Sequence, residues 1–564
     1  MRAHFAFFVR WNPNAALLAL LVIVVMGLLS CSHGGSSAGS GGTGLTGAAL
    51  TASNGTGATS GSGSGTATSG GSGGSGGSGT GSGSGSGTGS GGTGGSGGSG
   101  GGTSGGGSGG SGGGVTGTNL PPNSDPSGSV QTFTTDASGQ IDASGAFFQS
   151  LGSNGRTCAT CHQQSDGWSI SAADVQARFT QAQSAATGLS SDPLFQTDGA
   201  TCDQGMDLST PAGQANAFKL LTGKGLIRIP LAPPATAEFT VDSVVNQYGC
   251  GDKSTLSMYR RPLPAANLRF LSDLMWDGRE SFALNGTQNI ATATNPADLL
   301  ADLAHQAVDA TLIHAQGLAT SPLTPDQQKA IVNFEMALSV AQSTDLLAGP
   351  LKTDVTSGGP AQIAATAQQF VLGVNNPFSS VPFTTAIFNL FANWVNYNQS
   401  TTDGSQKASI ARGQIVFNTK PVLITGVAGF NGGAPFPGEC GYCHDSPNVG
   451  SHSVSDPMNI GVADVNNPLN PLDVSYLPVI TLRNITTAAT VQTTDPGVAL
   501  VTGKWADIGK MKVPVLRGLA SRAPYFHNGS AQTLSDVVNF YDQRFKIGFT
   551  AQEKADLIAF LSSL

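Results

Sequence analysis

The sequence is poor in charged and in aromatic side chains. Of its 564 residues, 11% are Asp, Glu, Lys or Arg and 7% are Phe, Trp or Tyr, and the formal net charge is −8. No patch of basic residues is present, which argues against nucleic acid as a partner. Strand-like alternation of apolar and polar residues is also scarce, so a fold made mainly of sheets is not expected. The length allows two or three domains.

One long stretch has no charged residue at all. From Gly34 to about Gly117 the chain consists almost only of Gly, Ser, Thr and Ala. Such a segment buries too little apolar surface to offset its ordering entropy. We therefore expect a disordered tether with a reach of roughly 50 Å by random-coil scaling, followed by a folded part that begins near Asn119.

The N-terminal apolar run is short for a membrane span. It covers residues 15–29, follows Arg2 and Arg10, and ends in LLSC, which is typical of a secretory signal. LLSC resembles a bacterial lipobox, which implies cleavage before Cys31 and lipid attachment to its thiol; a signal-anchor helix is the alternative. Ser32, rather than Asp, after this cysteine favours the outer membrane. We expect a lipid-anchored protein that faces the periplasm.

Cysteine is scarce, and its spacing is informative. Four of the seven cysteines form two C-x-x-C-H motifs: Cys158, Cys161 and His162, and Cys440, Cys443 and His444. This spacing attaches c-type haem through two thioethers and offers the imidazole to the iron. A lone C-x-x-C could be a redox dithiol or half a zinc site. Two copies, each followed by His in an exported chain, predict two covalently attached haem c groups.

Two cysteines remain after the motif pairs and Cys31 are assigned. They are Cys202 and Cys250, and export places them in an oxidising compartment. We predict a Cys202–Cys250 disulfide that stabilises the fold by on the order of 3–4 kcal/mol. Reduced, unpaired thiols are the alternative.

Helical periodicity dominates the folded part. Amphipathic or helical runs cover 145–162, 298–316, 324–342, 408–419 and 550–564. Thr324, followed by Pro325, predicts the start of the third run. The predicted fold class is mainly α, with two class I cytochrome c-like haem domains. The predicted domains are a signal peptide (1–30), the lipidated tether (31–118), an N-terminal haem domain with insertions (119–400) and a C-terminal haem domain (401–564).

Three stretches carry a family resemblance. They are RRPLPAANLRFLSDLMWDGRE (260–280), LAHQAVDA (303–310) and KMKVPVLRGLASRAPYFHNGSAQTLSDVVNFYD (510–542). With the two motifs, they make residues from about Gly145 to Leu564 resemble the bacterial di-haem cytochrome c peroxidases and their relative MauG. The resemblance implies that the N-terminal haem reacts with hydrogen peroxide and that the C-terminal haem relays electrons.

The resemblance also implies roles for single residues. His162 and His444 match the proximal iron ligands. Trp276 matches a tryptophan that lies between the haems, with an ordinary core residue as the alternative. Gln306 matches a glutamine of the distal pocket.

Tyr541 falls where classical members have the methionine ligand of the C-terminal haem and where MauG has tyrosine. A phenolate oxygen favours Fe(III) and should lower the reduction potential relative to a thioether. Met511 or Met458 is the alternative ligand, with Tyr541 packed in its helix.

The sequence departs from the family at several positions. It has no histidine between His162 and His305, so the family's switching distal histidine is missing, as in MauG. Arg261 stands where the family's calcium site has asparagine, which argues against calcium. Gln316 stands where the family has its acid–base glutamate, and an amide cannot take up a proton at neutral pH.

His314 is the main candidate to replace that glutamate. A histidine with a pKa near neutrality can move a proton between peroxide oxygens. It could instead bind the iron and close the site, or be purely structural, and His305 is the second choice for each role. We expect His527 to bond a propionate or the backbone, whereas His452 has no assigned role beyond competition for the second haem.

The expected function follows from these features. It is peroxide reduction, with electrons from a small cytochrome, another periplasmic donor or a protein side chain. A di-haem electron-transfer cytochrome without enzymatic activity is the alternative, and a di-haem oxygenase is a weaker one. Dimerisation, seen in many family members, stays open.

Overall fold

The computed structural model describes residues 115–203, 205–281, 296–379 and 382–564. The predicted signal peptide, Cys31 and nearly all of the tether lie outside these ranges. The helices in the described ranges are α2 (Ala172–Ser184), α3 (Pro211–Ala217), α4 (Lys219–Lys224), α5 (Pro296–His314), α6 (Pro325–Ala337), α7 (Pro360–Ala367), α8 (Thr402–Thr419), α9 (Ala499–Thr502), α10 (Leu534–Phe545) and α11 (Ala551–Ser562). None of these is long and apolar enough to cross a membrane.

Short strands form several small antiparallel sheets. They are β1 (Thr118–Asn119), β2 (Asn123–Asp125), β3 (Gly128–Thr134), β4 (Ile227–Leu231), β5 (Phe239–Val245), β6 (Leu256–Arg260), β7 (Leu338–Asp345), β8 (Gly349–Pro350), β9 (Lys352–Thr353), β10 (Thr356–Ser357), β11 (Val422–Ile424), β12 (Phe436–Gly438), β13 (Val479–Asn484) and β14 (Thr490–Thr493). The largest sheet has the order β1-β3-β7-β8, with β2 also paired to β3, and a three-stranded sheet has the order β14-β13-β5.

The described part is therefore mixed helix and sheet rather than mainly α. These strands were not predicted from the sequence because the strands they pair with are far away along the chain. Strand β3 pairs with β7 from Gly128↔Asp345 to Thr134↔Leu338, and β5 pairs with β13 from Val245↔Val479 onward. Local periodicity reports burial along one segment, whereas such pairing depends on residues elsewhere in the chain.

Helix α6 shows both a confirmed and a wrong boundary. Thr324 caps it as predicted: its Oγ1 accepts from the Gln327 backbone N–H at 3.2 Å, and the Gln327 side chain accepts from the Thr324 N–H at 2.9 Å. The helix ends at Ala337, however, and the predicted helical residues after it belong to β7. Pairing with β3 and burial in the sheet outweigh the weak helical preference of this short segment.

The segment before the first motif is not a helix. Residues 145–162 contain only two 3-10 turns, η1 (Ala146–Phe148) and η2 (Cys158–Thr160). Phe147 is buried there beside Phe334 of α6, with ring centroids 4.7 Å apart. The apolar residues of this segment thus fill the core from a turn and an irregular loop.

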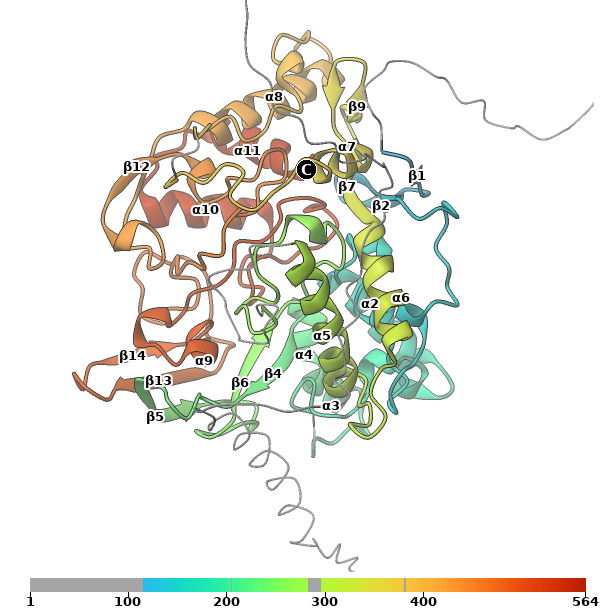
Figure 1. The fold of residues 1–564 in the computed structure, drawn as a ribbon, viewed down its shortest axis with the longest axis vertical. Helices are drawn as coiled ribbons and strands as arrows, with labels where there is room; N and C mark the ends of the chain where they lie inside the picture. The colour runs from blue at the N-terminus through green and yellow to red at the C-terminus, as the bar shows by residue number, and fades with distance from the viewer. Residues whose placement is uncertain (1–114, 204, 282–295, 380–381) are drawn as a thin grey trace, which may run out of the picture. The chain divides into compact units, whose positions relative to one another are not determined.

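Helices α8 and α11 pack against each other, as the predicted amphipathic faces require (Figure 1). Ile410 and Phe417 of α8 and Leu557 and Leu561 of α11 are buried in one core. Ile415, which lies in the same predicted amphipathic run, is 45% exposed. In Figure 1 these orange and red helices gather with α10, whereas α5 lies beside α6.

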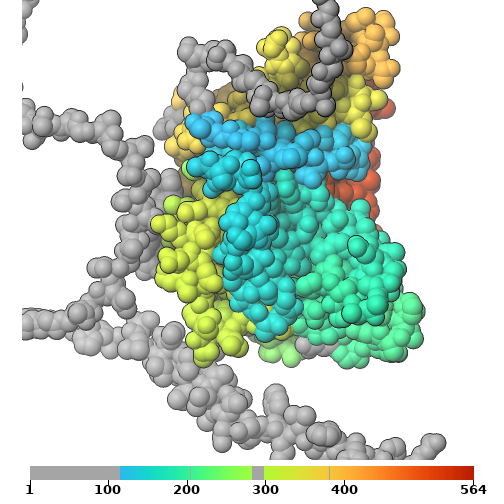
Figure 2. Space-filling view, turned by 90° about the vertical axis from the view of Figure 1, so that its right-hand side faces the viewer, coloured from blue at the N-terminus to red at the C-terminus, as the bar shows by residue number. Residues whose placement is uncertain are grey.

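The core around α8 and α11 begins earlier in the chain than residue 401. It includes Phe388, Phe391 and Trp394, which the sequence assigns to the N-terminal domain. Another core joins Phe147 and Trp168 with residues of α5, α6 and β7, and Figure 2 shows the blue N-terminal segment across this side. The division into two haem domains stays a prediction.

Candidate functional site

The first C-x-x-C-H motif lines a cavity. We call it the first-motif cavity, because Cys158, Cys161 and His162 contribute to its wall. Turn η2 and the following residues present these side chains. His162 Nδ1 lies 3.0 Å from the carbonyl oxygen of Trp168. A carbonyl only accepts, so Nδ1 carries the proton and the lone pair of Nε2 is available to iron.

The second motif repeats this geometry in a second-motif cavity, lined by Cys440, Cys443 and His444. Turn η9 (Cys440–Tyr442) presents the cysteines. His444 Nδ1 donates to the Gly450 carbonyl oxygen at 2.8 Å. Gly450 has φ +72°, and a Cβ there would lie 2.9 Å from Leu516 and Phe388 carbons, so only glycine fits this turn.

The four motif thiols are held in apolar surroundings. Burial raises the pKa of Cys158, Cys440 and Cys443 to about 12 and also raises the pKa of Cys161. These side chains are therefore neutral thiols at pH 7, unlike the activated thiolates of redox dithiols. None of the four forms a disulfide with its motif neighbour.

The two cavities share one wall. Arg261, Pro262, Leu263, Trp276 and Lys512 line both. Trp276 Nε1 donates to the Arg261 carbonyl oxygen at 2.8 Å, and its ring meets His527 edge-on with centroids 6.1 Å apart. The structure thus brings Trp276 between the two motif cavities.

Buried cations around these cavities fit a ligand that carries carboxylates. Arg261 and Arg522 line the second-motif cavity, and burial lowers the pKa of Arg261 to about 9 and that of Arg522 to about 10. The buried Nε of Arg522 has no hydrogen-bond partner among the described residues. A buried unpaired charge is costly, and a haem propionate would supply the missing anion. The residues present therefore fit haem.

Helix α5 forms part of the wall of the first-motif cavity. Gln306 and His314 line it together with Arg279 from the loop after Trp276. Burial, followed by the charges of Arg279 and Arg156, lowers the pKa of His314 to about 4. A neutral imidazole at pH 7 can either accept a proton or bind iron. Both predicted roles of His314 therefore stay open.

Three other sequence candidates lie outside both cavity walls. His305 is on the outer face of α5, where its Nδ1 lies 2.8 Å from Glu280 Oε2, so it does not substitute for His314 in the pocket. Gln316 is exposed just beyond α5 and contributes only its carbonyl, to Ser153, which removes it from the catalytic set. His452 is buried with Nδ1 2.9 Å from Asp445 Oδ2.

The second-motif cavity brings together all three proposed sixth ligands. Tyr541 of α10, Met511 and Met458 line it. Met458 and Met511 also face each other across a backbone bridge, with N–O distances of 2.8 and 3.0 Å. Burial raises the pKa of Tyr541, and the neighbouring Cys443 and Cys440 add to this. The wall of this cavity thus contains a phenol and two thioethers.

A buried ion-pair network that the sequence reasoning missed supports the shared wall. Arg260 donates to Asp495 through Nε at 2.7 Å and Nη2 at 2.8 Å, and it also pairs with Asp277. Asp277 further binds Arg279 at 3.0 Å. Arg260 is next to Arg261 and Asp277 is next to Trp276 in sequence, so the network holds the wall segments together. The charged residues in the stretches RRP and MWDGRE were the sequence signal that could have revealed this network.

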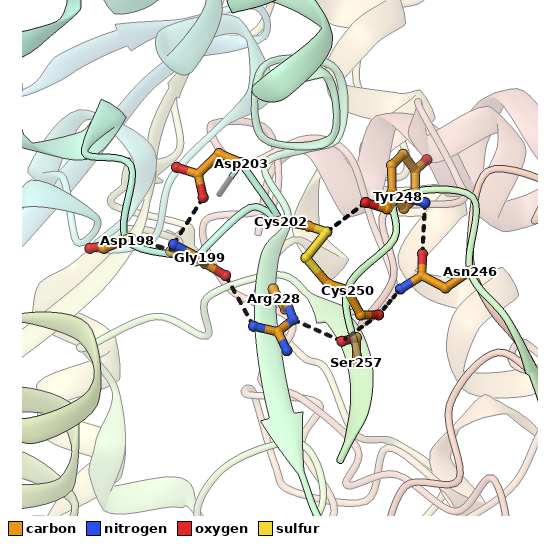
Figure 3. The surroundings of a disulfide bond; sticks show 10 residues. Asp198, Gly199, Cys202, Asp203, Arg228, Asn246, Tyr248, Cys250 and Ser257 are labelled. Atoms are coloured by element: carbon orange, nitrogen blue, oxygen red, sulfur yellow. Dashed lines mark hydrogen bonds between the residues drawn. A yellow bond between two sulfur atoms is a disulfide. The ribbon is translucent and has the colours of Figure 1, made fainter. Parts of the chain in front are cut away.

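Cys202 and Cys250, which the sequence pairs, form a disulfide in the structure with Cα atoms 5.6 Å apart (Figure 3). Thr201, beside Cys202, lines the first-motif cavity. Around the bond, Arg228 Nε donates to Ser257 Oγ at 2.8 Å and Asp203 accepts from the Gly199 N–H at 2.9 Å. The disulfide therefore ties a cavity loop to the segment between β5 and β6.

Comparison with known proteins finds relatives over part of the chain. Cytochrome-c peroxidase IdrP1 of Pseudomonas sp. (strain SCT) is 41% identical over 81 residues, which is 12% of this chain and 21% of the relative. Cytochrome-c peroxidase IdrP2 of Denitromonas iodatirespirans is 35% identical over 140 residues, which is 22% of this chain and 36% of the relative. The chain thus spans between a fifth and two fifths of these relatives. No family model matches the chain.

Solved structures show a more distant likeness. A MauG-like protein associated with microbial copper homeostasis aligns with 74% of this chain and 87% of its own, at 15% identity and a TM-score of 0.30. Hydrazine synthase of Kuenenia stuttgartiensis aligns with 70% of this chain and 93% of its own chain, at 15% identity and a TM-score of 0.27. The sequence relatives connect this chain to cytochrome-c peroxidases, which are haem oxidoreductases, at modest identity and partial coverage.

Proposed function

We propose that this protein is a di-haem c-type oxidoreductase of the cytochrome c peroxidase and MauG type, reducing hydrogen peroxide at its first haem. The observation that carries the proposal is the pair of C-x-x-C-H cavities with one shared wall. A single such cavity would suit a simple carrier. Two that share Trp276 suit an enzyme that collects electrons at one site and uses them at the other.

Haem, once bound to both motifs, supplies the redox chemistry that the side chains of this chain lack. Cys158 and Cys161 hold one group and Cys440 and Cys443 hold the other. His162 and His444 keep Nε2 toward the iron because each Nδ1 is bound to a backbone carbonyl. Arg261 and Arg522 supply buried positive charge for propionates.

The residues that share the first-motif cavity with His162 bind the substrate and move its proton. Gln306 orients peroxide through its amide, which can both donate and accept a hydrogen bond. With haem bound, neutral His314 would take the proton from one peroxide oxygen and pass it to the other, which leaves as water. The whole reduction takes up two electrons from the donor and two protons, and it yields two water molecules. Burial of His314 keeps it in the proton-accepting form at neutral pH.

The shared wall carries the electrons. Trp276 is held by its bond to the Arg261 carbonyl and by the edge contact with His527. Its polarisable ring lies on the route from the second-motif cavity to the first. A small cytochrome, another periplasmic donor or a protein side chain provides the electrons.

The proposed location follows from the N-terminal sequence. Residues 1–30 act as a lipoprotein signal, and Cys31 carries the lipid that anchors the chain to the outer membrane. The tether of residues 31–118 then lets the catalytic part face the periplasm. Metabolic labelling with a fatty acid, lost in Cys31→Ala, tests the anchor.

The decisive experiment for the enzymatic proposal is spectroscopy combined with turnover. We expect the ferric protein to show a high-spin haem by electron paramagnetic resonance and to consume hydrogen peroxide with a reduced small cytochrome. His314→Ala should keep the high-spin signal and lose most of the turnover. Ferric protein without a high-spin haem and without any reaction with peroxide contradicts the proposal.

An electron-transfer cytochrome is the second candidate, because His314 and His162 line the same cavity. In that case both haems are low-spin in the wild type, and His314→Ala converts one of them to high-spin. A di-haem oxygenase is a third and weaker candidate. Dioxygen-dependent cleavage of polyisoprene without added peroxide is its test.

A further inference from the structure

We propose that Glu280, His305 and Asp309 form a zinc site on the outer face of α5, separate from both motif cavities. The three residues each offer one ligand atom, and these atoms all lie within 4.8 Å of one another. The site concerns residues that have no part in the proposed peroxide chemistry, so it stands or falls independently of that function.

Two elements supply the three ligands. His305 and Asp309 are one turn apart on α5, so both project from the same face of this helix. Glu280 comes from the loop that follows Trp276, and its Oε2 lies 2.8 Å from His305 Nδ1. Two ligands on one rigid helix turn and a third from a packed loop make a preorganised chelate.

The electrostatics of the cluster favour a divalent cation. The Glu280 side chain is only 5% exposed, and burial together with the charge of Asp309 raises its pKa. The cluster holds two carboxylates and one imidazole, so even with His305 protonated it keeps an excess negative charge. Arg279 also faces Glu280, but its Nη1 pairs with Asp277 at 3.0 Å.

The donor set selects zinc. One imidazole nitrogen and two carboxylate oxygens are ligands that Zn²⁺ accepts, with water in the fourth position. Ligand atoms of a tetrahedral zinc site lie roughly 3.4 Å apart for bonds of about 2.1 Å, so small side-chain rotations suffice here. The side chain of His305 is 52% exposed, which gives the ion a path from solvent.

Zinc at this site would join two walls of the first-motif cavity. Gln306 and His314 belong to α5, and Arg279 and Trp276 belong to the loop of Glu280; all four line that cavity. A bound ion would therefore hold the loop against α5 without entering the cavity. We expect zinc to raise the melting temperature of the protein.

The test is isothermal titration of the full-length holoprotein with zinc chloride after treatment with a chelator. We expect one equivalent of zinc to bind to the wild type, and His305→Ala and Glu280→Gln to weaken that binding by at least about tenfold. The rise in melting temperature should disappear in the same variants. Asp326→Asn, which removes an exposed carboxylate from α6, is the matched control and should bind zinc like the wild type.

If the buried Glu280 variant fails to fold, Asp309→Asn takes its place in the test. Asp309 is only half-buried, so this variant is expected to fold. Soret and circular dichroism spectra report whether each variant is folded. Wild-type protein that takes up no zinc overturns the site. So does equal affinity in the wild type and in the folded His305→Ala and Asp309→Asn variants.

Discussion

At the scale of single residues, the two cavities differ in the donor groups that line them together with the motif histidine. The first offers an amide and an imidazole, Gln306 and His314. The second offers Tyr541, Met511 and Met458. A hard phenolate and a soft thioether stabilise different oxidation states of iron. The identity of the sixth ligand would therefore shift the reduction potential of a haem bound in the second-motif cavity.

Replacement of Tyr541 tests this point. If its oxygen binds the second haem, Tyr541→Met should raise the reduction potential of that haem by on the order of 0.1 V, well inside the range of about 0.8 V that axial ligands span. Spectroelectrochemical titration measures the change, and Met511→Leu serves as the control. A potential that shifts in Met511→Leu and not in Tyr541→Met would assign the ligand to Met511.

His527 predicts a pH dependence of stability. Burial lowers its pKa to about 4, and the side chain is 4% exposed, whereas an unfolded histidine titrates near about 6.5. The unfolded chain therefore binds more protons between these values, and stability falls as the pH is lowered through this window. From pH 7.5 to 5 this residue should cost about 2 kcal/mol.

Urea unfolding of wild type and His527→Gln at the two pH values measures that difference. The variant should lose about 2 kcal/mol less than the wild type on acidification, whatever its stability at pH 7.5. Equal pH slopes would show that His527 does not titrate within this window in the folded protein.

At the scale of elements, the fold depends on close contacts between segments far apart in sequence. The disulfide closes a loop of 48 residues between Cys202 and Cys250. By loop-closure entropy, a cross-link of this span stabilises by about 4 kcal/mol. The double variant Cys202→Ala/Cys250→Ala should lose that amount in urea unfolding under oxidising conditions. A dithiol reductant should lower the wild type toward the variant, and it should leave the variant unchanged.

Substitution of Gly413 measures how much stability is lost when α8 is pushed away from α11. A Cβ at this position would overlap the Asp556 backbone carbonyl, so Gly413→Ala must push the helices apart. Overpacking costs about 1–3 kcal/mol and outweighs the gain in helix propensity of about 1 kcal/mol. Gly223→Ala in α4 is the control, because a Cβ there meets no atom within 4 Å; it should stabilise. A stabilised Gly413→Ala would contradict the predicted packing.

At the scale of the whole molecule, the two motif cavities form one system because they share a wall. That wall combines Arg261 and Trp276 with Lys512, more than 200 residues later in the sequence. The Arg260–Asp495 pair, also buried, holds the same two regions together. Coupling between the cavities therefore depends on the tertiary fold and not on either motif.

Trp276→Leu tests this coupling. We expect turnover with an external electron donor to fall by about tenfold or more, because the polarisable ring is lost from the wall, while peroxide affinity stays near the wild-type value. Stopped-flow mixing with peroxide separates binding from electron transfer. Loss of affinity together with turnover would instead mark Trp276 as part of the peroxide pocket.

Features that depend on neighbouring residues were more predictable from the sequence than long-range strand pairing was. The motifs Cys158 to His162 and Cys440 to His444 are local, so spacing alone identifies them. Capping of α6 by Thr324 is local too, and it was predicted correctly. Strand β7 was missed because its partner β3 lies about 200 residues earlier, where no local periodicity reports it.

The sequence by itself determined two C-x-x-C-H motifs, the histidine of each and the pool of candidate distal residues, because each depends on residue type and short spacing. Only the tertiary structure decided which candidates face a cavity. Gln306, His314, Tyr541 and Met511 line one, whereas Gln316 is exposed and His305 meets Glu280. The direction of a side chain follows from helix ends and long-range packing, which neighbouring letters of the sequence do not specify.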